Sequence, residues 1–130
     1  MKTKKHKPQR KPVYSTFPIS DEASVALSHA LLFVINLKGF SFESEKISLD
    51  SAYSAENKLF DKITTLTRGE VRATAKAIDV ILELAPDGFS AYSYIDEEIE
   101  GLISDVHRGL PIYELLAPVF RQAVINLKNR

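Results

Sequence analysis

The feature that most constrains this chain is an apolar run from residue 23 to residue 37. Its large apolar residues point in nearly every direction around a helical axis: Val25, Leu27, Leu31, Leu32, Phe33, Val34, Ile35 and Leu37. A helix that is apolar on nearly every side must be covered on several sides. The run includes Ser24, Ser28, His29 and Asn36 and is shorter than the roughly 20 apolar residues of a membrane span. We therefore expect the central helix of a bundle, or a helix shared with a second copy.

The residues around this run predict where its helix begins and ends. Ser20 is a good N-cap, and Asp21 and Glu22 follow it at the positive end of the helix dipole. The expected helix continues to Lys38, where Gly39 can adopt the left-handed conformation that ends helices.

Apolar residues at helical spacing predict two more helices in the middle of the chain. The first carries Leu49, Ala52, Tyr53, Leu59, Phe60, Ile63 and Leu66. The sequence TRGE at residues 67–70 predicts a capping box that opens the next helix. That helix places Val71, Ala75, Ile78, Ile81 and Leu82 on one face and ends near Ala85, because Pro86 disfavours a helical residue before it.

Two further helices are expected in the last third of the chain. One spans about Ser90 to His107 and ends at Gly109. The other has Pro111 in its first turn and carries Ile112, Leu115, Leu116, Val119, Phe120, Val124 and Leu127. Pro118 falls inside this last pattern and removes a backbone donor, so we expect a kink or a break into two short helices.

The predicted fold class is therefore all-α, an antiparallel bundle or compact array of about five helices without strand pairs. Residues 1–18 are expected to form a flexible, disordered basic N-terminal arm, and residues 19–130 a single helical domain. Tyr14, Phe17 and Ile19 are expected to pin the end of the arm onto the body. Phe40 and Phe42 are expected core anchors in the segment 40–48, which alternates briefly like an extended strand.

A net charge of zero conceals a strong asymmetry along the chain. Residues 1–12 contain six of the seventeen Lys and Arg residues and no acid, so residues 13–130 sum to −6. The arm does not have the pattern of a secretory signal, because prolines interrupt it and acids precede the first apolar run. The chain has no cysteine, which excludes disulfides, thiolate metal sites and a cysteine nucleophile, and favours the cytoplasm.

Two groups of cations are candidates for binding nucleic acid. The arm contributes Lys4, Lys5, Lys7, Arg10 and Lys11. The body contributes Lys58 and Lys62, then Arg68, Arg72 and Lys76 at spacings of four on the next helix, an arrangement that partly resembles a helix-turn-helix unit. Asp79 and Glu83 continue the same stripe as acids, so ordinary surface pairs such as Lys76 with Asp79 are the competing explanation.

An acidic and aromatic cluster is the candidate for binding a protein partner. Five acids, Asp96, Glu97, Glu98, Glu100 and Asp105, fall on the helix expected from Ser90. The aromatics Phe89, Tyr92 and Tyr94 lie at its start, and exposed tyrosines are frequent interface anchors. We take Asp96, Glu97, Glu100 and Tyr92 as the candidate protein-binding residues, although acids also stabilise the start of any helix.

No catalytic, metal or cofactor motif is recognisable. His6, His29 and His107 are far apart and lack metal-ligand spacing, and the five glycines form no phosphate loop. We therefore expect no cofactor and no enzymatic activity, but a helical protein that binds another protein as a small regulator, inhibitor or adaptor, as a homodimer. The alternative is a nucleic-acid-binding protein that uses the arm and the body cations. An enzyme with dispersed residues is a third hypothesis.

Overall fold

The computed structural model describes residues 13–87 and 101–129, and within these ranges the fold is predominantly helical. Five α-helices follow in order: α1 (Asp21–Ile35), α2 (Leu49–Phe60), α3 (Arg68–Leu84), α4 (Leu102–Arg108) and α5 (Leu110–Lys128). Two short strands, β1 (Tyr14–Thr16) and β2 (Thr65–Thr67), and two 3-10 turns, η1 (Glu43–Glu45) and η2 (Ala85–Asp87), complete the described elements. The predicted all-α array of about five helices is confirmed.

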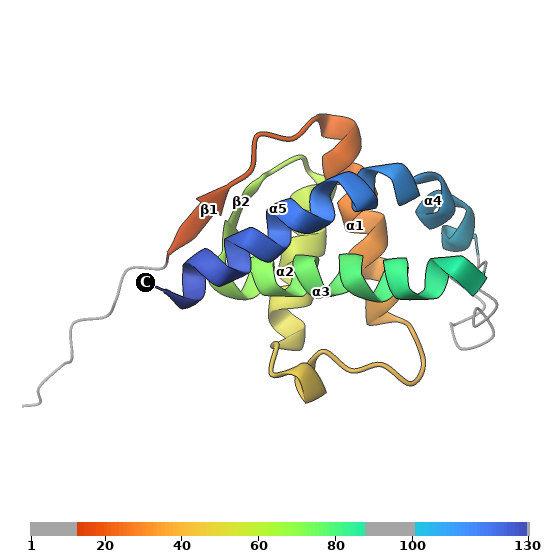
Figure 1. The fold of residues 1–130 in the computed structure, drawn as a ribbon, viewed down its shortest axis with the longest axis horizontal. Helices are drawn as coiled ribbons and strands as arrows, with labels where there is room; N and C mark the ends of the chain where they lie inside the picture. The colour runs from red at the N-terminus through yellow and green to blue at the C-terminus, as the bar shows by residue number, and fades with distance from the viewer. Residues whose placement is uncertain (1–12, 88–100, 130) are drawn as a thin grey trace, which may run out of the picture.

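Helix α1 is the central helix, as its sequence predicts. It contacts α2, α3, α4 and α5, so neighbouring helices cover it on several sides (Figure 1). Ser20 caps its start by accepting a hydrogen bond from the Ala23 amide at 3.1 Å. The helix ends at Ile35, earlier than predicted, because the Asn36 side chain binds the Leu32 carbonyl at 2.9 Å. Gly39 has the expected positive φ of 88° in the following turn.

Helices α2 and α3 pack on α1 and on each other. The Ser24 hydroxyl near the start of α1 donates to the Leu59 carbonyl near the end of α2 at 2.7 Å, so these two helices run antiparallel. The second predicted helix is too long, since α2 ends at Phe60 and Leu66 lies in β2. The predicted capping box of Thr67 and Glu70 is present at the start of α3.

The two strands correct the expectation of a fold without strand pairs. Tyr14 pairs with Thr67 and Thr16 with Thr65 in an antiparallel register. Phe17 follows β1 into the core and stacks on Phe120 of α5, with ring centroids 4.3 Å apart. Residues 14–17 therefore pack on the folded body, as expected of the segment that joins the arm to it; residues 1–12 lie outside the described ranges.

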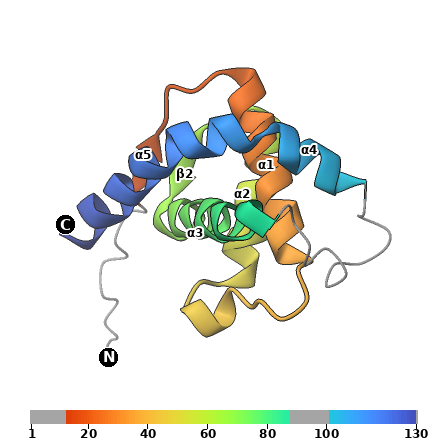
Figure 2. The ribbon, with the colours of Figure 1, turned by 45° about the vertical axis from the view of Figure 1, so that its right-hand side comes forward.

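Helix α5 runs across the molecule as one element (Figures 1 and 2). Pro118 lies inside it without dividing it into two helices, and Pro111 is in its first turn as predicted. Tyr113 of α5 is completely buried and donates its hydroxyl hydrogen to the Ala26 carbonyl at 2.7 Å. A Cβ atom at Gly109 would lie 2.7 Å from Cζ of this ring, so the helix junction requires glycine there.

The segment between α1 and α2 is not extended. It forms the turn η1, and Phe42 is buried and in edge contact with Phe40, as expected of core anchors. The helix predicted from Ser90 is described only from Leu102 onward. None of the described helices has the length and hydropathy required to cross a membrane.

Candidate functional site

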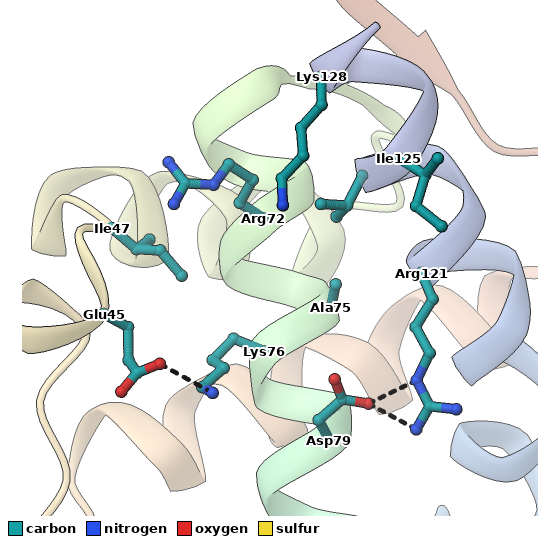
Figure 3. Close-up of a pocket in the computed structure, with 10 residues that line it drawn as sticks. Glu45, Ile47, Arg72, Ala75, Lys76, Asp79, Arg121, Ile125 and Lys128 are labelled. Atoms are coloured by element: carbon teal, nitrogen blue, oxygen red, sulfur yellow. Dashed lines mark hydrogen bonds and ion pairs between the residues drawn. The ribbon is translucent and has the colours of Figure 1, made fainter.

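An open groove lies between α3 and α5 (Figure 3). Its volume is about 490 Å³. Helix α3 lines it with Arg72, Ala75, Lys76 and Asp79, and α5 with Arg121, Val124, Ile125 and Lys128. Each set has the spacing i, i+3, i+4, i+7, which places all four residues on one helix face. Glu45 and Ile47 close the side next to η1.

Two ion pairs neutralise one end of the groove. Lys76 Nζ lies 2.9 Å from Glu45 Oε1. Arg121 donates from both Nε and Nη2 to Asp79 Oδ1, at 2.9 and 2.7 Å. All four side chains are between 34% and 56% exposed. Exposed pairs of this kind contribute about 0–1 kcal/mol, so either can be exchanged for a ligand at little cost.

The other end of the groove is positively charged. Arg72 and Lys128 have no hydrogen-bonded acceptor or ion-pair partner within residues 13–87 and 101–129. Figure 3 shows Lys128 extending from α5 toward Arg72. Arg68, one turn before Arg72, donates to the Leu127 carbonyl at 3.1 Å and so connects the start of α3 to the end of α5.

The structure brings only part of the predicted nucleic-acid face together. Arg72 and Lys76 line the groove, whereas Lys58 and Lys62 do not. Lys62 is exposed just after α2, with a φ of 63°. The arm residues Lys4, Lys5, Lys7, Arg10 and Lys11 lie outside the described ranges.

The prediction of a surface ion pair between Lys76 and Asp79 is wrong. Each residue pairs instead across the groove, Lys76 with Glu45 and Asp79 with Arg121. Sequence reasoning missed Arg121 and Lys128 as site residues. Their i, i+7 spacing indicates that they share one face of α5, but the face of α3 that they meet depends on how the helices pack.

Lys58 belongs to a buried corner at the start of α3, which we call the Glu70 corner (Ser54, Lys58, Thr67 and Glu70). Lys58 Nζ and the Thr67 amide both donate to Glu70 Oε1 at 2.8 Å. The Ser54 hydroxyl donates to the other carboxylate oxygen. Burial acts to raise the pKa of Glu70, but these three donors outweigh it and lower the pKa below 4.5.

The solvent side of α2 carries a second distinctive surface, the α2 face (Leu49, Tyr53, Phe60 and Ile63). These residues are 37%, 44%, 55% and 48% exposed, although the sequence pattern gives them the same helical spacing as the core. The side of α2 that packs inward consists of Ala52, Ala55 and Leu59. Leu115 and Val119 of α5, also on a predicted apolar face, are exposed as well.

Glu56 lies in the middle of the α2 face, about one turn from both Tyr53 and Phe60. Burial raises its pKa, while the positive charge of His29 on α1 partly opposes that rise and the negative charge of Asp61 adds to it. His29 also lines a shallow groove of about 200 Å³ with Glu22, Asp105 and Arg108. The described residues contain no group of three or more metal-ligating side chains.

The predicted protein-binding residues Asp96, Glu97, Glu100 and Tyr92 lie outside the described ranges. Asp105, the last acid of that cluster, is described and forms an ion pair with Arg108 in α4. Comparison of the chain with protein-family models, curated proteins and solved structures gives no match.

Proposed function

We propose that this chain is a non-enzymatic, cytoplasmic protein that acts by binding another protein, and that two copies pair through the α2 face. The observation that carries the proposal is the exposure of Leu49, Tyr53 and Phe60 along one side of α2, with the exposed Ile63 just after the end of the helix. Contiguous exposed apolar groups on a folded surface are typical of interaction sites.

The geometry of α2 supports the interpretation of these exposed residues as an interaction surface. Leu49, Tyr53 and Phe60 follow one another at i, i+4 and i+11, so they form a single stripe along the helix. The inward side is already filled by Ala52, Ala55 and Leu59, and the stripe therefore contributes nothing to the core of a single copy. Aromatic residues are enriched in protein interfaces, where they bury a large area with few rotatable bonds.

A second copy is the occupant that fits the charges of this face. A two-fold dimer uses the same patch on both subunits, so the patch must be complementary to itself. The α2 face surrounds Glu56, and His29 is near enough for its charge to act on that carboxylate. The large side chains of this patch, Leu49, Tyr53 and Phe60, are uncharged and can therefore pack on those of a second copy.

The test is the molar mass in solution, measured by light scattering and sedimentation. We expect a dimer for the native chain and a monomer for Tyr53→Asp and Phe60→Asp, with unchanged circular dichroism and melting temperature of the monomeric fold. Leu115→Asp is the matched control, since Leu115 is 73% exposed on α5, outside the face. A monomeric native chain, or equal dissociation by Leu115→Asp, would overturn the pairing.

Binding of nucleic acid is the second candidate, favoured by Arg72 and Lys128 in the groove, which have no acceptor among the described residues, and by the six cations of residues 1–12. It requires an affinity that falls steeply with salt, because released counterions drive such binding. Deletion of residues 1–12 would then weaken binding, and an unchanged affinity would count against this candidate.

A further inference from the structure

We propose that the groove between α3 and α5 binds an extended acidic peptide segment of a partner protein, with carboxylates next to apolar side chains. This inference deepens the proposed function and rests on it, because it assigns the partner's chemistry to a particular site. The groove is separate from the α2 face, so the two surfaces can be tested independently.

The acidic part of the ligand follows from the cations of the groove. Four cations and two carboxylates line it, which leaves a net charge of +2. Both carboxylates, Glu45 and Asp79, are already engaged. Arg72 and Lys128 are the groove cations with no acceptor within the described residues, and they lie together at one end. An arginine guanidinium binds a carboxylate through two parallel hydrogen bonds, and the adjacent lysine adds a second positive charge.

The apolar part of the ligand follows from the remaining lining. Ile47, Val124 and Ile125 border the groove, and Ile125 is 49% exposed. A ligand side chain that covers Val124 and Ile125 would remove their exposed apolar surface from water, at roughly 25 cal/mol per Å². The groove is open along two helices and is not an enclosed cavity. Small-molecule sites enclose most of their ligand, so an extended peptide fits this groove better than a small molecule does.

The placement of the two carboxylates argues for a peptide over a nucleic acid. Glu45 and Asp79 lie toward the end opposite Arg72, where they accept from Lys76 and Arg121. A nucleic-acid strand has a phosphate at every step and would bring negative charge close to both. A peptide can place its acids at the Arg72 end and uncharged residues at the other.

The probe for a binding experiment is a dye-labelled peptide in which Glu, Leu and Ile alternate with Ser. In an extended chain this order presents acidic and apolar side chains on one side. Fluorescence anisotropy measures its affinity for the full chain. We expect saturable binding, and a loss of about tenfold or more in the double variant Arg72→Glu, Lys128→Glu, because each reversal removes a charge-assisted contact.

Matched variants distinguish the groove from general charge effects. Lys62→Glu reverses one charge on an exposed lysine outside the groove, as each member of the double variant does inside it, and should leave the affinity within about twofold once salt is present. Asp79→Asn should raise the affinity, because it makes the groove more positive. No binding by the native chain, or an equal loss in Lys62→Glu, would overturn the proposal.

Two further measurements separate this inference from its competitors. A single-stranded oligonucleotide that binds more tightly than the peptide and depends on the same two residues would overturn the peptide assignment. The Phe60→Asp variant should bind the peptide as the native chain does, because Phe60 is outside the groove. If the native chain is a dimer but does not bind the peptide, the groove proposal is wrong and the proposal of dimerisation through the α2 face still stands.

Discussion

Two charged regions are built on the same helix, the Glu70 corner at the start of α3 and the groove along its outer face. Both contain lysine–glutamate pairs at nearly the same distance, 2.8 Å for Lys58 with Glu70 and 2.9 Å for Lys76 with Glu45. They differ in burial. The Glu70 side chain is 4% exposed, whereas that of Glu45 is 42% exposed.

This difference in burial assigns the two regions different roles. A buried carboxylate is tolerated only when donors surround it, and Glu70 has donors from Lys58, Ser54 and the Thr67 amide. Removing Glu70 takes away the acceptor that Ser54, Lys58 and the Thr67 amide share. An exposed pair is solvated in either state, so its partners can separate and rejoin around a ligand. The corner therefore stabilises the fold, and the groove remains available for binding.

The largest expected effect is that of Glu70→Ala. It removes half of the capping box and leaves Ser54 and the Thr67 amide without their acceptor, which should lower the free energy of unfolding by about 2–4 kcal/mol. Urea unfolding followed by circular dichroism measures this loss. Glu45→Ala is the control and should cost less than about 1 kcal/mol. Equal losses in the two variants would remove the distinction between corner and groove.

The pH dependence of stability gives a smaller effect from the same residue. The pKa of Glu70 is lower in the folded chain than its ordinary value of 4.5. The stability that its ionised form contributes is therefore present above pH 4.5 and is lost as the pH falls through the lowered folded value. Melting temperatures of the native chain and Glu70→Gln should converge in that acidic range. If the difference in melting temperature between the native chain and Glu70→Gln does not change with pH, the charge of Glu70 contributes nothing to stability.

The smallest expected effect is at Glu56, a carboxylate that lacks the donors of the corner. Its raised pKa means that ionisation is less favourable in the folded chain, so its charge lowers stability as the pH rises above 4.5. Glu56→Gln should therefore raise the melting temperature slightly at pH 7 and leave it unchanged in acid. The exposed Glu43, changed in the same way, is the control. A lower melting temperature at pH 7 would show that Glu56 is stabilised by its surroundings.

The sequence alone predicts the corner better than the groove, for a physical reason. The capping box is a local arrangement, in which Thr67 and Glu70 are three residues apart and their spacing determines the contact. The groove depends on which face of α5 meets α3. Arg72 and Lys76 could be identified as one stripe, but their position opposite Arg121 and Lys128 results from packing between distant segments.

The α2 face shows a second limit of sequence periodicity. Helical spacing indicates that Leu49, Tyr53 and Phe60 share one side of the helix, but it does not say which side is buried. Here the small residues Ala52 and Ala55 face inward and allow α2 to approach its neighbours closely, so the larger residues face solvent. The sequence pattern also did not predict β1 and β2, because three residues are too few to show the alternation of side chains that is typical of a strand.

The stacking of Phe17 on Phe120 has a consequence for the order of events during synthesis. The ribosome makes Phe120 about 100 residues after Phe17. At about 5–20 residues per second, the first ring waits roughly 5–20 s for its partner. Until then the β1 segment can pair with β2, but Phe17 lacks the ring on which it stacks. Full docking of this segment therefore follows the synthesis of α5, and truncated chains lacking α5 should leave it more open to proteases.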